Sequence, residues 1–169
     1  MPLVKDASFV EDRWRHLADD EALPDKGDVT VTSARWLKER GALAAAPGLR
    51  IGVRLPNDVA PATLGDIVSA PLVVLQFPKF TDGRAYSQAR LLRQRLGFRG
   101  ELRATGNVLR DQLLFMQRCG FDSFEVPERA VAEDWLAAFR EFDVFYQPAA
   151  DGRPWLAARR HANEDVATA

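Results

Sequence analysis

Cysteine and histidine are nearly absent from this chain. Its only cysteine is Cys119, which excludes an internal disulfide, a redox pair of cysteines and a cysteine-ligated zinc or iron–sulfur site within the chain. Its two histidines, His16 and His161, lie near opposite ends, and neither has a second ligand at a spacing common in metal sites. We therefore expect no metal and no cofactor.

Long apolar runs and an excess of one charge are also missing. No apolar run approaches the roughly 20 residues that a membrane-spanning helix requires. The 23 basic and 24 acidic side chains leave a net charge of −1, so any anion binding must be local. The amino-terminal stretch "MPLVKDASFVEDRWRHLADDEALP" lacks the continuous apolar region of a signal peptide. These absences predict a cytoplasmic protein that binds neither nucleic acid nor membrane.

The common catalytic and cofactor motifs do not occur either. The chain contains no G-x-G-x-x-G, no P-loop and no G-x-S-x-G, and we find no motif for flavin, nicotinamide, haem or an iron–sulfur cluster. The motifs therefore identify no catalytic residue.

What is present is a regular alternation of strand and helix patterns. The run "PLVVLQFPKF", from residue 71, is typical of a strand buried on both faces. The helix after it has a core face of Ala85, Ala89, Leu92 and Leu96 and should end at Gly97. "GELRAT" and "FDSFEV" are the next strands, and "GNVLRDQLLFMQRC" and "PERAVAEDWLAAFREF" the next helices.

The earlier part of the chain gives a weaker version of this pattern. We expect a helix from Ser33 to about Ala45, a strand over residues 51–55 and a brief helix in "APATLGDIVSAP". Residues 1–30 should form a loosely packed arm, and residues 160–169 a flexible tail. Length and pattern together predict one α/β domain over residues 1–169.

The repeated βα units predict a mainly parallel sheet in a three-layer or a partial-barrel arrangement, because parallel strands need helical crossovers. Strand order, which would separate these two arrangements, is left open. In both, ligands bind at loops after the carboxyl ends of the strands. Here those loops are residues 79–84, 105–107 and 125–127.

Basic residues and glycines gather at these loops and predict an anion site, because helix amino termini and glycine turns favour anions. The candidates are Lys79, Asp82, Gly83, Arg84, Arg103, Gly106 and Asn107, which should converge on one concavity. The alternative is structural: Asp82 caps its helix, and the arginines are solvated or pair with Asp82 and Asp111.

Three further residues leave alternatives open. In "ELRAT", Arg103 shares a strand face with Glu101, so it is paired with a carboxylate, reserved for a ligand, or exposed on an edge strand. Gln112 lies within an apolar helix face, where it bonds a neighbour or reaches into a pocket. Cys119 lies on the same face, and we interpret it as a packing residue.

A polar ridge on the helix after residue 84 is a candidate docking surface. Tyr86, Arg90 and Arg93 lie away from that helix's apolar face and should form a contiguous exposed strip. Such a strip would suit an acidic partner or a homodimer contact.

The stretches "DGRAYSQARLLR" and "VLRDQLLFMQRCGFD" resemble a bacterial family of unknown function encoded beside the siroheme sulfite reductase. Members are often labelled probable oxidoreductases involved in sulfite reduction. The resemblance is dense over residues 77–126, although Asn107 stands where that family more usually carries Asp. It implies a pathway, assimilatory sulfite reduction in cysteine biosynthesis, and no catalytic residues.

Three functional hypotheses follow. The first is an accessory protein that acts with sulfite reductase or its electron donor and binds a sulfur oxyanion or a phosphate-bearing ligand. The second is an enzyme for a small anionic substrate, with Asp82, Arg84, Arg103 and Gln112 in its pocket. The third is an interaction module that docks a redox partner.

Overall fold

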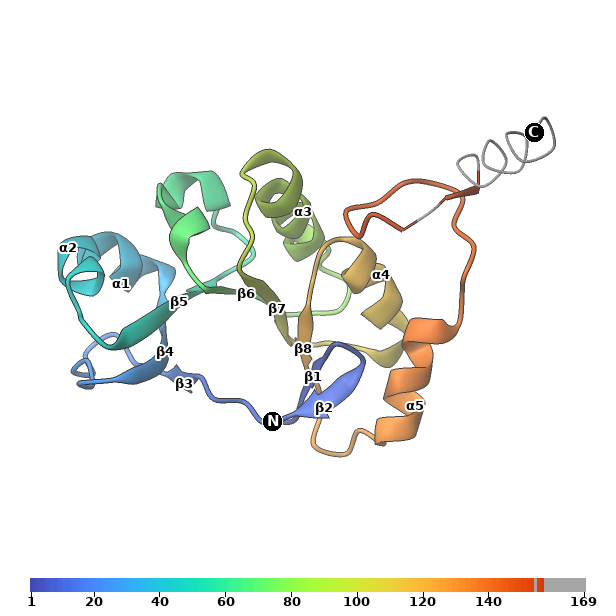
Figure 1. Ribbon diagram of the computed structural model, residues 1–169, viewed down its shortest axis with the longest axis horizontal. Helices are drawn as coiled ribbons and strands as arrows, with labels where there is room; N and C mark the ends of the chain where they lie inside the picture. Colours follow the sequence, from blue (N-terminus) through green and yellow to red (C-terminus); the bar gives the residue numbers. More distant parts are fainter. Residues whose placement is uncertain (154, 157–169) are drawn as a thin grey trace, which may run out of the picture.

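A computed structural model describes residues 1–153, 155 and 156. The expected tail over residues 160–169 and the second histidine, His161, lie outside the described residues. Eight strands form one sheet in the order β2-β1-β8-β7-β6-β5-β4-β3 (Figure 1). The strands are β1 (Leu3–Lys5), β2 (Ser8–Val10), β3 (Arg15–His16), β4 (Gly27–Thr32), β5 (Leu49–Leu55), β6 (Leu72–Phe77), β7 (Glu101–Gly106) and β8 (Ser123–Glu125).

Helices or 3₁₀ turns connect the parallel strands β4 to β8, and α5 follows β8. The α-helices are α1 (Ser33–Lys38), α2 (Arg40–Ala44), α3 (Arg84–Arg90), α4 (Leu113–Arg118) and α5 (Ala132–Ala137). Short 3₁₀ turns occur at Pro61–Leu64, Ile67–Ser69, Arg110–Gln112 and Ala138–Arg140, and a π turn, Leu91–Arg95, extends α3. None of the helices in this described part is long and apolar enough to cross a membrane.

The order of the strands selects the partial barrel over the three-layer arrangement. Strands β3 to β8 are parallel and adjacent in chain order, so every right-handed crossover places its helix on the same face of the sheet. Figure 1 shows α1 to α4 on that side. The α/β class and the mainly parallel sheet are therefore confirmed, as a curled half-barrel with a convex, helix-covered face.

The main core lies between the helices and the convex face. Val73, Leu75 and Phe77 of β6 are fully buried, as are Ala85, Ala89 and Leu92 on the expected core side of α3. The helices end near the predicted Gly97 and Gly120, whose φ angles of +71° and +107° lie in the left-handed region that favours glycine. The βα repeat from residue 71 onward was thus read correctly.

Residues 1–30 do not form the loosely packed arm that we expected. They contribute β1, β2, β3 and the start of β4, and they bury Leu3, Val4 and Leu17. The β1–β2 hairpin adds antiparallel strands to the β8 edge of the sheet, and β3 pairs with β4 at the opposite edge. Backbone pairing therefore fixes this segment, although its sequence is rich in acids and turn residues.

A short link between these two edges requires the sheet to curl. β2 ends at Val10 and β3 begins at Arg15, so five residue steps, or about 17 Å of extended chain, join opposite edges. Seven spacings across a flat eight-stranded sheet would measure about 33 Å. The link, residues 11–14, therefore crosses the concave face and brings the two edges towards each other (Figure 1).

Candidate functional site

The concave face carries polar side chains because β4, β5, β7 and β8 alternate between apolar and polar residues, whereas β6 is apolar on both faces except for Gln76. Val29 and Val31 of β4 are buried towards the helices, whereas Thr30 and Thr32 occupy the other face. The same alternation places Arg54 of β5 on the concave side. The β7 and β8 residues of this face are Glu101, Arg103, Thr105, Ser123 and Glu125.

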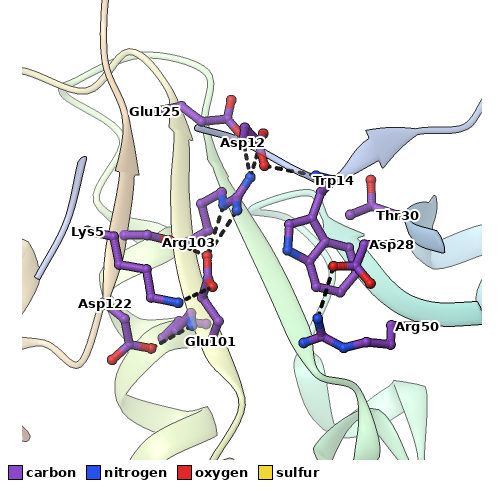
Figure 2. A network of polar contacts seen from close by, with 12 residues as sticks. Lys5, Asp12, Trp14, Asp28, Thr30, Arg50, Glu101, Arg103, Asp122 and Glu125 are labelled. Atoms are coloured by element: carbon purple, nitrogen blue, oxygen red, sulfur yellow. Dashed lines mark hydrogen bonds and ion pairs between the residues drawn. The ribbon is translucent and has the colours of Figure 1, made fainter. Parts of the chain in front are cut away.

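Arg103 lies at the centre of this face and is only 1% exposed. Its Nη1 donates to Asp12 Oδ2 at 2.8 Å, and its Nη2 donates to Glu101 Oε1 at 3.0 Å. Glu125 Oε1 lies 3.7 Å from Nη1, too far for a hydrogen bond. Figure 2 shows the guanidinium between Glu101 on one side and Asp12 and Glu125 on the other. Of the three alternatives for Arg103, pairing with carboxylates is the one observed.

Glu101 joins this cluster to β1 and β8. It accepts hydrogen bonds from Lys5 Nζ at 2.6 Å and from Ser123 Oγ at 2.7 Å. Burial by itself raises the pKa of Glu101, but these two bonds and the Arg103 charge outweigh it and bring the pKa below its ordinary value. Glu101 is therefore ionised near neutral pH and balances part of the Arg103 charge.

A cavity of about 270 Å³ opens at the carboxyl end of the strands beside this cluster. This is the edge at which ligands bind in parallel α/β proteins. Its lining comes from β3 to β8 and the residue after β5, and comprises His16, Thr32, Arg54, Leu55, Pro56, Val74, Gln76, Thr105 and Glu125. The cavity is our candidate functional site.

Two side chains of the cavity lining have buried polar atoms without hydrogen-bond partners among the described residues. Arg54 uses one Nη to donate to the carbonyl of Leu17, but its Nε has no acceptor. Glu125 accepts from Thr105 Oγ1 at 2.5 Å through Oε2, whereas its Oε1 has no donor. Buried polar atoms are seldom left unpaired, so the cavity offers an unused cationic donor and an unused anionic acceptor.

His16 lies at the rim of the same cavity. Its Nδ1 is 2.6 Å from Thr30 Oγ1, and its Nε2 is 3.8 Å from Glu125 Oε1. Burial lowers the pKa of His16; the Glu125 and Asp12 charges raise it and Arg54 lowers it further, with a net decrease. The imidazole is therefore neutral at neutral pH and offers one nitrogen lone pair.

The structure does not bring the predicted anion-site residues together. Arg84 bonds Asp82 bidentately at the surface, with Arg84 Nη2 2.7 Å from Asp82 Oδ2, and hydrogen bonds from Arg84 hold the pKa of Asp82 well below its usual range. Arg103 is committed to the concave face. Neither of the two cavities described here is lined by Lys79, Asp82, Gly83, Arg84, Arg103, Gly106, Asn107 or Gln112.

The correction has a physical reason in the direction of the side chains. Arg103 projects into the concave face because of its parity on β7, whereas Arg84 projects from the start of a helix outside the sheet. Gly83, Gly106 and Asn107 are exposed. Gln112 is half-buried in a 3₁₀ turn, and its Oε1 has no partner among the described residues. Of the expected ligand loops, Thr105 and Glu125 do line the candidate site.

Tyr86, Arg90 and Arg93 do not form one exposed ridge. Arg90 is exposed, but Tyr86 packs its ring against Phe77 and Phe115, and burial raises its pKa to about 12. Arg93 donates to the carbonyls of Phe98, Gly100 and Gly120 and to Asp122. Arg93 therefore holds loops of its own chain together.

A larger cavity, about 680 Å³, lies between α3, α4 and residues 141–150. Tyr86, Arg90 and Cys119 contribute to its lining, together with the exposed Phe115 and Phe142. Burial raises the pKa of the Cys119 thiol, so it remains protonated near neutral pH, as expected of a packing residue.

Sequence reasoning missed Asp12, His16 and Arg54. Arg54 carried a readable signal, because "RIGVRL" alternates Arg50, Gly52 and Arg54 with apolar residues and so predicts a polar strand face. The sequence around Asp12 and His16 gave no such signal. They approach Glu125 only because the 11–14 link crosses the concave face.

The fold and this site define an α/β half-barrel with a polar cavity at the carboxyl edge of its sheet. The chain belongs to a family described as bacterial protein of unknown function (DUF934), whose family model matches residues 52–156. The match includes Arg54, Arg103 and Glu125, whereas Asp12 and His16 precede it. No curated protein and no solved structure matches the chain.

Proposed function

We propose that this protein binds a small oxyanion in the carboxyl-edge cavity and serves assimilatory sulfite reduction, within cysteine biosynthesis, as an accessory protein. The observation that carries the binding proposal is the side chain of Arg54, which lines a cavity at the ligand-binding edge and whose shielded Nε has no acceptor among the described residues. An oxyanion supplies that acceptor, and charge-assisted hydrogen bonds are the stronger kind in proteins.

The rest of the lining supports a small and polar ligand. Gln76 offers an amide that can donate to an oxyanion, and Thr32 and Thr105 add polar surface, although their hydroxyl protons are donated to Asp19 and Glu125. A volume of about 270 Å³ lies just below the usual range for drug-sized ligands, and suits an ion such as sulfite, sulfate or phosphate. A phosphate-bearing ligand would place its remaining atoms outside the cavity.

The pathway part of the proposal comes from the resemblance over residues 77–126. It makes sulfite reductase or its electron donor the natural partner. A deletion strain would then grow poorly on sulfate and sulfite but normally on sulfide. Equal growth of the deletion and parent strains on all three sulfur sources would remove the pathway assignment and leave the binding proposal to its own test.

Calorimetric titration with sulfite, sulfate, phosphate and adenylyl sulfate tests the binding proposal. Arg54→Gln should weaken the preferred anion at least about tenfold, because a charged hydrogen bond contributes about 1.5–3 kcal/mol. Arg50→Gln is the matched control, since Arg50 lies on the same strand but pairs with Asp28 at its exposed amino end. Arg54→Lys keeps the charge and should retain part of the affinity. Equal affinities for the Arg54 and Arg50 variants would refute the site.

An enzyme acting on a small anionic substrate is the second candidate, and one contact favours it. His16 Nε2 and Glu125 Oε1 lie 3.8 Å apart beside Arg54, so a proton donor or acceptor adjoins the proposed anion site. Turnover of a bound anion that is lost in His16→Gln while binding persists would establish this alternative. Binding without turnover favours the accessory role.

A further inference from the structure

Asp12 and His16, four positions apart near the amino terminus, meet Glu125 from the other end of the sheet. Their candidate ligand atoms all lie within 4.8 Å of one another. Asp12 belongs to the 11–14 link, His16 to β3 and Glu125 to the end of β8. The geometry points to a divalent metal site formed by these three side chains, at the edge of the proposed oxyanion cavity; it does not rest on the oxyanion proposal.

Glu125 gives the first support beyond the grouping itself. The residue is 7% exposed, and its Oε1 accepts no hydrogen bond within the part of the chain that the structure describes. Leaving a charged oxygen buried without a partner costs more than leaving a neutral one. Arg103 Nη1 lies 3.7 Å from this oxygen, too far for a hydrogen bond, and a bound cation would supply the direct contact that is lacking.

His16 gives the second support. The contact between its Nδ1 and Thr30 Oγ1, at 2.6 Å, orients the ring and directs Nε2 at Glu125 Oε1. Metal-binding histidines commonly have their other nitrogen held in this way. When Nδ1 donates to Thr30, the Nε2 lone pair faces a carboxylate lone pair at 3.8 Å, and a metal ion between them removes the repulsion.

The spacing suits metal–ligand bonds. Two bonds of about 2.1 Å can join atoms up to about 4.2 Å apart, which includes the 3.8 Å between His16 Nε2 and Glu125 Oε1. Asp12 already accepts from Arg103 Nη1 and from the Trp14 amide, so it completes the set only by sharing one of these oxygens with the metal. One imidazole nitrogen and two carboxylates suit Zn²⁺, Mn²⁺ or Fe²⁺, and the adjacent cavity leaves room for a further ligand.

The surrounding charges permit a metal together with an anion. Arg103, Lys5 and Arg54 carry three positive charges, and Asp12, Glu101 and Glu125 carry three negative ones. Arg103 therefore weakens the attraction for a bare cation. A divalent cation and a divalent oxyanion bound together leave this cluster neutral.

The test is calorimetric titration of the full, chelator-treated chain with MnCl₂ and with ZnCl₂, without an oxyanion in the buffer. We expect one site per chain. His16→Gln and Glu125→Gln should each weaken the preferred metal at least about 100-fold, because loss of an outer-shell partner alone commonly costs 10–100-fold. Glu11→Gln and His161→Gln, which remove the same kinds of group elsewhere in the sequence, should bind as the unchanged protein does.

His16 is exposed, and among the described residues its ring has one hydrogen-bond partner, Thr30, so His16→Gln should fold even if Glu125→Gln does not. The absence of stoichiometric binding in the unchanged chain, or unchanged affinity in His16→Gln, would overturn the metal site. Arg54→Gln should keep the metal and lose the oxyanion, so the two proposals fail separately.

Discussion

The two faces of strand β7 are both buried, but one is apolar and the other is charged. On β7, Leu102 and Ala104 are fully buried in the core against the helices, whereas Arg103 is almost equally buried on the concave face among carboxylates. The convex side is stabilised by apolar burial, which requires no particular partner. The charged groups of the concave side stabilise the fold only while each has a partner of opposite charge, so their contribution depends on ion pairs.

The comparison extends to the two arginines of the concave face. Arg103 has its charge shared among Asp12, Glu101 and Glu125, and it serves structure. Arg54 lies nearby on β5 and donates to the Leu17 carbonyl, but its buried Nε has no acceptor among the described residues. Two arginines of one face thus differ in their hydrogen bonding, because only Arg103 has carboxylate partners within that part of the chain.

We expect the largest loss of stability when the positive charge of Arg103 is removed. Arg103→Met keeps much of the side-chain volume but leaves three carboxylates close together without their cation. Breaking a buried ion pair in this way costs about 3–5 kcal/mol of unfolding free energy, measured by urea denaturation.

Leu102→Ala is the matched variant on the opposite face, with an expected cost of about 2–5 kcal/mol from lost burial and the cavity left behind. The two variants should lose stability to different extents as the pH changes. The Arg103→Met loss should shrink as the carboxylates protonate in acid, whereas the Leu102→Ala loss should not. Parallel pH profiles for both variants would contradict the division into paired and apolar faces.

A smaller effect is expected from Glu101→Gln, which tests one carboxylate of the cluster. Because the folded-state pKa of Glu101 lies below the ordinary 4.5, its ionised form stabilises the fold above that value. This contribution is lost as the pH falls through the lowered pKa. The variant should therefore be less stable than the unchanged protein at neutral pH, and the difference should narrow in acid. Urea titrations from neutral to acid pH measure this stability difference. A difference that widened in acid would contradict the expected direction of the pH dependence.

The smallest effect is expected from Arg84→Ala. Arg84 and Asp82 form a well-aligned ion pair, but both lie at the surface, where such pairs contribute about 0–1 kcal/mol. Thermal unfolding should shift little, and anion affinity should not change. A loss of stability as large as that of Arg103→Met would show that burial does not control the strength of these pairs.

The regular part of the fold followed from the sequence because its signals are local. The apolar run at Leu72–Phe77, the helix face of Ala85 and Ala89 and the stops at Gly97 and Gly120 each depend on neighbours within a few residues. The βα order then required a parallel sheet. Strands β1 to β3 were missed because they are two or three residues long and are ordered by pairing, β2 with β1, β1 with the distant β8, and β3 with β4.

The sequence also predicted part of the candidate site. Strand parity placed Glu101 and Arg103 on one face and predicted that a buried Arg103 needs a carboxylate or a ligand, while the carboxyl-edge rule pointed to Thr105 and Glu125. Those inferences concern a residue and its own strand, which the sequence determines directly.

Only the tertiary structure decided which residues meet. The sequential strand order and the 11–14 link curl the sheet, and that curl brings Asp12 and His16 to Glu125, more than 100 positions further along the chain. Arg84 and Arg103, which were expected to converge on one concavity, are separated because Arg103 projects from the concave face of β7 and Arg84 from the start of α3. Spacing along a chain reports local geometry, whereas distances across a curled sheet depend on strand order and closure, and neither has a local signal.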